Sequence, residues 1–253
     1  MTVRRLLFLA FVFVYSLCFA QEELPTISAD LSGNTWGADV TPLHKLSWDN
    51  GFGFESEAGG SHTVTLNTTI VRYSIFENVE LRIGTSFLMW NEGQAPEPSF
   101  GLDPLTIGTK LKVYDGTEIL PSVGFLAEFQ SPHLGSKELL PSHLAPSLYL
   151  LFENEINDWL DICYNAGTEW DGESATPTTF LSLCLNFGIT ETLGTYVESF
   201  NYLHPEDDNQ YMVGVGLTWL ASRRVQLFLS TDLDFQNLGK YYSVNSGVAW
   251  LIN

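Results

Sequence analysis

Residues 63–90 read TVTLNTTIVRYSIFENVELRIGTSFLMW, two alternating segments joined by a short polar turn near Glu77. In the second segment apolar and polar side chains take opposite faces of an extended chain: Val79, Leu81, Ile83, Thr85, Phe87 and Met89 alternate with Glu80, Arg82, Gly84 and Ser86. Such a period of two is typical of a β-strand. Strands of soluble sheets usually have about 5–6 residues, whereas a strand that crosses a bilayer obliquely needs about 9–11. The length of the alternation therefore predicts membrane-crossing strands.

The first twenty residues, Met1–Ala20, have the three-part pattern of a cleavable secretory signal. Arg4 and Arg5 precede the apolar run LLFLAFVFVYSLCFA, and acidic residues follow soon after Ala20. An anchoring helix is the alternative, but the apolar run is shorter than the roughly 20 residues that a spanning helix needs. Cys18 does not indicate a lipoprotein site, because the residue before it is Leu17 and not a small one. We therefore expect export and cleavage after Ala20.

The chain is strongly acidic, with 11 lysine and arginine residues against 30 aspartate and glutamate residues. Cleavage after Ala20 removes two arginines and no acidic residue, so the mature chain has 9 basic and 30 acidic residues and a formal charge of −21. This excess of negative charge argues against nucleic acid as a partner. The remaining cysteines are Cys163 and Cys184, without metal-ligand spacing, and no phosphate-binding glycine loop occurs. The sequence therefore predicts no cofactor and no metal site.

Residues 21–43 lack alternation, and we interpret them as an irregular leader that lies in the periplasm or in the lumen of a barrel. Prolines at positions 96, 98 and 104 indicate that residues 91–104 form a loop and no strand. Elsewhere between residues 44 and 253, segments with alternating apolar and polar residues recur between turn signals. The connections between these segments alternate between short and long. This organisation predicts an all-β protein, an up-and-down antiparallel transmembrane β-barrel of about 12 strands.

Each apolar face has a polar face opposite to it, and in a barrel the polar faces share one interior. We expect the charged residues on these faces to line the lumen and to determine its selectivity: Arg72, Glu80, Arg82, Lys110, Lys112, Glu128, Glu153, Asp161, Glu198, Asp232 and Asp234. The alternative is the solvated side of a soluble sheet, but the apolar faces are too numerous to fit one core. Carboxylates outnumber basic groups in this set, so a conducting lumen should favour cations or neutral solutes.

Three runs of the sequence carry a resemblance to a known family: NTTIVRYSIFENVELRIG, GLDPLTIGTKLK and PSLYLLFENEINDWLDICYNAGTEWDG. With NTWGADVTP and the closing SVNSGVAWLIN, they resemble the outer-membrane transporter family labelled as the MetA pathway of phenol degradation. The resemblance implies a bacterial outer-membrane barrel that moves small, hydrophobic or aromatic molecules, and it brings no catalytic residues. One departure is the last residue, Asn253, where such barrels commonly end on an aromatic assembly signal; Trp250 is the nearest substitute.

The function that this sequence favours is passive or facilitated diffusion through the barrel, with outer-membrane lipid and an unidentified small solute as partners. A barrel that conducts little and displays loops is the alternative, because about eight strands are filled by side chains and about sixteen leave a clear channel. An enzymatic dyad could be drawn from His133 or His143 with Ser136 or Ser142. No orienting third group or oxyanion donor accompanies it, so we expect no enzyme. The sequence does not determine the solute or the oligomeric state.

Two further expectations concern geometry. The connections should alternate between the periplasm, near Glu77, Asp115, Asn157, Glu191 and Arg223, and the outside, near Glu97, Lys137, Asp171, Asp207 and Asn237. Cys163 and Cys184 should face inward on consecutive strands, with residue 163 opposite residue 183 or 184. This register leaves open either a cross-strand disulfide or two small side chains that fill a crowded lumen, and the geometric demands of a bridge favour the second.

Overall fold

The structure, a computed structural model, describes residues 26–91, 93, 97–205 and 208–252. The expected signal segment at residues 1–20, the connection at Asp207 and the terminal Asn253 lie outside the described residues. Within these ranges the helical content is one short 3-10 turn, η1 (Asp30–Ser32). No described helix has the length and apolarity that a membrane span requires.

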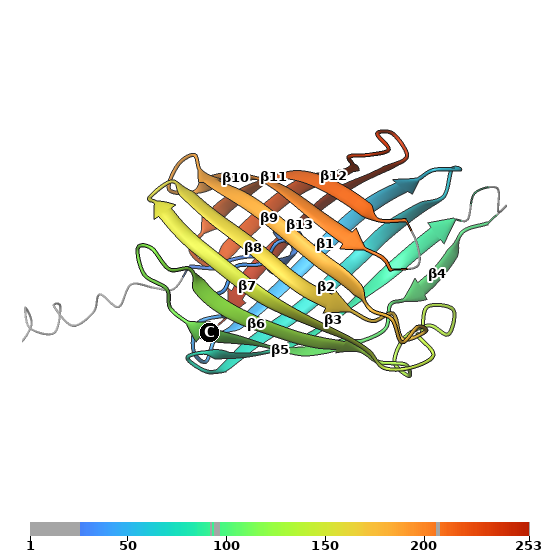
Figure 1. Ribbon diagram of the computed structural model, residues 1–253, viewed down its shortest axis with the longest axis horizontal. Helices are drawn as coiled ribbons and strands as arrows, with labels where there is room; N and C mark the ends of the chain where they lie inside the picture. The colour runs from blue at the N-terminus through green and yellow to red at the C-terminus, as the bar shows by residue number, and fades with distance from the viewer. Residues whose placement is uncertain (1–25, 92, 94–96, 206–207, 253) are drawn as a thin grey trace, which may run out of the picture.

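Thirteen strands form one antiparallel sheet that closes on itself (Figure 1). The ring closes because β1 (Leu46–Glu57) pairs with β2 (His62–Phe76) on one side and with β13 (Tyr241–Ile252) on the other. From β5 to β13, each strand pairs with the next in the chain. The other strands are β3 (Val79–Asn91), β4 (Ser99–Leu102), β5 (Thr106–Tyr114), β6 (Ser122–Gln130), β7 (Ala145–Asn157), β8 (Leu160–Glu169), β9 (Thr178–Gly188), β10 (Leu193–Leu203), β11 (Gln210–Ser222) and β12 (Val225–Asp234).

Two of the thirteen strands share one position in the barrel. The first half of β3 pairs with β5, and its second half pairs with β4. The barrel therefore has twelve strand positions, which confirms the predicted architecture. The expectation of no strand within residues 91–104 is wrong for β4. Pro98 and Pro104 flank this short strand and neither lies in it, and a proline removes a ladder hydrogen bond only at its own position.

Alternation places apolar side chains outside and polar ones inside, as residues 63–90 predicted. On β3 the side chain of Leu81 is 47% exposed, whereas that of its neighbour Glu80 is fully buried. Trp159, Trp219 and Trp250, all near one end of the barrel, are also exposed. A soluble protein would not expose so many large apolar side chains, but in a bilayer the lipid covers them. The outer face is thus built for hydrocarbon, with aromatic residues at the interface.

The two groups of connections lie at opposite ends of the barrel. We call the end that holds the connections near Asn78, Asp115, Asp158, Glu191 and Arg223 the turn end, and the opposite end the loop end. β1 begins and β13 ends at the turn end, where Leu46 pairs with Ile252. The alternation of connections is therefore as expected, and the assignment of the loop end to the outside stays a prediction.

Aromatic side chains enter the lumen where the neighbouring strand has glycine. A Cβ atom on Gly216 would lie 2.3 Å from the ring of Tyr196, and one on Gly167 would lie 2.2 Å from the ring of Tyr149. Because glycine has no side chain, each ring can lie flat against the next strand. The interior is therefore more aromatic than the charged residues of the polar faces suggest.

Candidate functional site in the barrel lumen

Residues 26–43, the described part of the expected leader and hereafter called the leader, lie inside the barrel (Figure 1). The leader enters at the turn end, where Ile27 N–H donates to the carbonyl of Arg223 at 2.9 Å. It returns to the same end, where Leu43 forms a β-bridge with Ser74 before β1 begins. Between these points it runs past strands on all sides of the barrel.

Inward carboxylates of the wall bind the backbone of the leader. Glu198 on β10 accepts the N–H of Asn34 at 2.9 Å, Glu153 on β7 accepts that of Ala38 at 2.9 Å, and Glu80 on β3 accepts that of Thr41 at 2.8 Å. Asn165 on β8 accepts the N–H of Trp36 at 2.8 Å and donates to its carbonyl at 2.9 Å. Because the leader has no regular secondary structure beyond η1, these side chains satisfy backbone groups that would otherwise be buried without partners.

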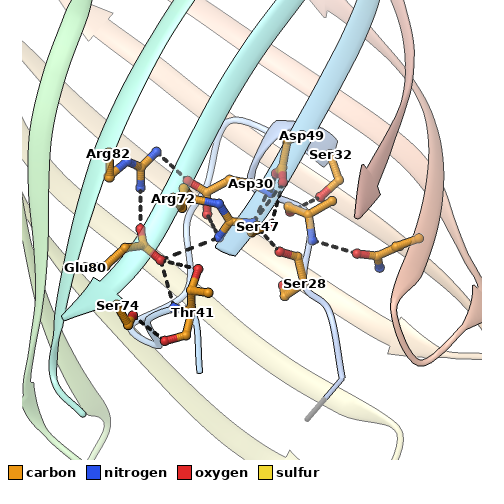
Figure 2. Close-up of polar contacts among 12 residues, drawn as sticks. Ser28, Asp30, Ser32, Thr41, Ser47, Asp49, Arg72, Ser74, Glu80 and Arg82 are labelled. Atoms are coloured by element: carbon orange, nitrogen blue, oxygen red, sulfur yellow. Dashed lines mark hydrogen bonds and ion pairs between the residues drawn. The ribbon is translucent and has the colours of Figure 1, made fainter. Parts of the chain in front are cut away.

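A buried ionic network fixes the leader at η1 (Figure 2). Asp30 of the leader pairs with Arg82 at 2.5 Å and with Arg72 at 3.3 Å. Arg72 also pairs with Asp49 at 3.1 Å, and Asp49 accepts the N–H of Asp30 at 2.7 Å. Arg82 pairs with Glu128 at 2.9 Å, which links the network to β6.

Charge compensation explains why Asp30 is ionised despite its burial. Removal from water alone would raise the pKa of its carboxyl group, but the guanidinium groups of Arg82 and Arg72 hold that pKa well below its usual value. A buried pair that loses one partner leaves an uncompensated charge, which is strongly destabilising. The leader is therefore held by electrostatics as well as by backbone hydrogen bonds.

The remaining sequence-predicted residues lie in three environments. Lys112 bonds Asp39 of the leader and Asp115 of the adjacent connection, at 2.9 and 2.6 Å, and both of those carboxylates are exposed. Lys110 and Asp161 line the lumen on the turn side of the leader. Asp232 and Asp234 line it on the loop side.

The leader divides the lumen into two cavities. The loop-side chamber has a volume of about 860 Å³, and the turn-side chamber has a volume of about 520 Å³. Asp30 and Trp36 line both, so the leader is the partition between them. A volume of several hundred Å³ is typical of sites that hold small molecules. Either chamber is therefore large enough for a small organic solute.

An aromatic group that the sequence reasoning missed forms part of the loop-side chamber. Phe200, Tyr202, Met212 and Tyr241 line it, together with Trp36 of the leader. Trp36 and Tyr202 pack on the buried ring of Phe180, with ring centroids 5.9 and 5.3 Å away. The sequence contains the signal for this group, because Phe200, Tyr202 and Tyr241 alternate with outward residues on their strands.

Cys163 and Cys184 are directly opposite each other on β8 and β9, as the register predicted. Both are buried and both are free thiols in the structure. The amide of Asn186 contacts both sulfur atoms, with Nδ2 at 3.5 Å from Cys163 Sγ and Oδ1 at 3.4 Å from Cys184 Sγ. In the structure the two thiols therefore fill the lumen wall, and the formation of a disulfide after export stays a prediction to be tested.

Three of the four residues considered for catalysis, Ser136, Ser142 and His143, form contacts within the loops. Ser136 Oγ accepts the N–H of Leu102, and Ser142 N–H donates to Glu173. His143 Nδ1 lies 3.2 Å from the carbonyl of Gly172. These contacts link the long connection after β6 to its neighbours.

Comparison with solved structures finds the same fold at low sequence identity. The crystal structure of the COG4313 outer membrane channel from Pseudomonas putida F1 aligns with a TM-score of 0.65 and 12% identity, over 87% of this chain and 100% of that chain. The KdgM porin in complex with disordered oligogalacturonate aligns with a TM-score of 0.58 and 11% identity, over 81% and 98% of the two chains. At this level of identity the likeness concerns the fold alone.

A family profile matches nearly the whole barrel. The family described as "Putative MetA-pathway of phenol degradation" matches residues 29–252, a span that includes most of the leader and every described strand. No curated protein matches the chain. The leader is thus part of the sequence pattern that the family model describes.

Proposed function

The chain belongs to the family described as "Putative MetA-pathway of phenol degradation", and we propose that it is a channel for small solutes in the bacterial outer membrane. The observation that carries the proposal is a closed barrel with an apolar outer face and a chamber of about 860 Å³ inside it. The aromatic lining of that chamber supports a solute with an apolar or aromatic body. Both solved structures compared above are described as a channel or a porin.

The charged residues of the wall divide into two groups in this proposal. Glu80, Glu153 and Glu198 hold the leader and set the width of the lumen. The second group lines the chambers and sets the selectivity of the channel: Lys110, Asp161, Asp232 and Asp234. The selectivity of the channel then depends on fewer residues than the polar faces contain.

A barrel that conducts little is the second candidate, and the partition of the lumen by the leader favours it. Planar-bilayer recording of the purified mature protein separates the two functions. A channel gives discrete conductance steps that an equal volume of detergent buffer does not produce. A complete lack of steps from protein that is folded by circular dichroism would reject the channel.

Export through a cleaved signal is a further part of the proposal, with residues 1–20 as the signal, 21–43 as the leader and 44–253 as the barrel. The expected product is a protein in the outer-membrane fraction whose first residue is Gln21. N-terminal sequencing of that fraction tests it. A chain that keeps residues 1–20 would contradict the cleavage.

A further inference from the structure

Asp232 is a buried carboxylate that has no cationic partner among the described residues. Its side chain is on the inward face of β12, opposite Gly214 of β11 and Ser243 of β13, and the residue is 5% exposed. Oδ2 accepts hydrogen bonds from Ser243 Oγ at 2.7 Å and from Asn245 Nδ2 at 3.4 Å. Oδ1 has no hydrogen-bond partner among the described residues, and no described lysine or arginine lies within ion-pair distance.

The chamber around Asp232 is strongly acidic. Seven carboxylates line it against two basic groups: Asp30, Glu55, Glu57, Asp103, Glu128, Asp232 and Asp234 against Arg82 and Lys240. Arg82 is already paired with Asp30 and Glu128, and Lys240 donates to the amide oxygen of Asn237. In the part of the chain that the structure describes, no basic side chain therefore forms an ion pair with the carboxylates on the β12 side of the chamber.

Aromatic rings line the same chamber, from the adjacent strand β13 and from β10, which is two strands away. Phe200 on β10 pairs with Met212 on β11, which pairs with Asp234 on β12, two residues from Asp232. Tyr241 precedes Ser243 by two residues on the same inward face of β13. The faces of aromatic rings carry partial negative charge and attract cations within about 6 Å. The carboxylate and the rings thus line one chamber, and each kind of group attracts organic cations.

We infer that the loop-side chamber binds small organic cations, an ammonium group attached to an aromatic or apolar body. The ammonium would neutralise the charge of Asp232, and the body would lie against Phe200, Tyr202 and Tyr241. This inference rests on the proposed channel function, since it names the class of solute that the channel receives. A neutral solute of the same shape would fill the volume and leave the carboxylate without a counter-ion, which is unfavourable for a buried charge.

Isothermal titration calorimetry of the full mature protein in detergent micelles tests the inference without requiring conduction. The probes are phenethylammonium, its neutral analogue 2-phenylethanol and the ring-free ethylammonium, each corrected for heat of mixing with empty micelles. Phenethylammonium should bind at least about tenfold more tightly than 2-phenylethanol, since hydrogen bonds to charged groups contribute the equivalent of one or two factors of ten. It should also bind at least about threefold more tightly than ethylammonium.

Matched variants locate the site. Asp232→Asn keeps the shape of the side chain and removes its charge, and it should lower phenethylammonium affinity about tenfold or more. Asp161→Asn removes a carboxylate from the turn-side chamber and should change the affinity less than about twofold. Equal binding of ammonium and alcohol to the wild type, or equal losses in both variants, would overturn the inference. If Asp232→Asn does not fold, the affinities of the wild-type protein for phenethylammonium and 2-phenylethanol decide whether the inference holds.

The failure of this inference is distinct from failure of the channel. Conductance steps with no preference for phenethylammonium would leave a channel without a cation site. Cation binding in micelles without conductance steps would leave a cation site in a barrel that does not conduct.

Discussion

The two halves of the lumen use inward carboxylates in different ways, and the pair Glu198 and Asp232 shows the difference most clearly. Both residues pair with Gly214 of β11, Glu198 from β10 on one side and Asp232 from β12 on the other. Glu198 accepts the N–H of Asn34 and the hydroxyl of Thr35 from the leader. Asp232 accepts bonds from wall residues of β13 only, and it faces the chamber beyond the leader.

Contact with the backbone of the leader, and not the type of side chain, therefore decides whether a lumen carboxylate holds the leader or faces a chamber. Where a backbone amide comes within 3 Å, the carboxylate is a structural acceptor, as Glu153 and Glu80 also are. Where neither a leader amide nor an arginine does so, as at Asp232, the charge remains available to a solute.

Removal of the leader should have the largest effect. Deletion of residues 26–40 takes away the partition between the chambers and should raise single-channel conductance severalfold, because the current then passes through one continuous lumen. Planar-bilayer recording measures it. Asp161→Asn is the control, since it removes one charge from the turn-side chamber and leaves the leader in place, and its conductance should stay close to the wild type. Unchanged conductance after the deletion would show that the leader does not limit the current.

The two ion-pair environments should differ in stability. Arg82→Met leaves Asp30 and Glu128 without their guanidinium partner and should destabilise the barrel by about 3–5 kcal/mol, the usual cost of breaking a buried pair. Lys112→Met removes a cation whose partners are exposed, and the cost should be about 0–1 kcal/mol. Urea unfolding in lipid vesicles, followed by tryptophan fluorescence, compares the two. Equal losses would mean that the network around η1 is not what holds the leader.

Ion selectivity should separate Asp232 from Glu198. The wild-type channel should favour cations, because acidic residues dominate the loop-side chamber. Asp232→Asn should reduce this preference more than Glu198→Gln, since the Glu198 charge is engaged by the leader. Reversal potentials across a KCl gradient measure the preference. Clear anion selectivity of the wild type would reject the electrostatic interpretation of the chamber.

The smallest effect is expected at the cysteine pair. The mature protein, unfolded without a reducing agent, should titrate two free thiols, because Cys163 and Cys184 fill the wall as thiols. Cys184→Ser, a change of one atom, should alter the free energy of unfolding by no more than about 1 kcal/mol. Fewer than two thiols in the unreduced wild type would indicate that the bridge forms after export.

Local alternation allowed much of the fold to be predicted from the sequence. The faces of β3 follow directly from the sequence of residues 79–91, because successive side chains of a strand point to opposite sides wherever the strand lies. The inward position of Arg72, Glu80 and Asp232 and the register of Cys163 with Cys184 follow for the same reason. The sequence did not predict β4, because four residues between prolines are too few to show the alternation of a strand.

The sequence by itself thus determined the twelve strand positions of the barrel and which of the charged residues on them face inward. Only the tertiary structure decided which inward residues are used by the leader and which remain free. The leader has no period, and its partners are far away in the chain: Ala38 and Glu153 are 115 residues apart, and Asn34 and Glu198 are 164 apart. Any exposed backbone N–H can pair with any carboxylate. The choice between Glu198 and Asp232 therefore depends on where the closed barrel brings each strand relative to the leader.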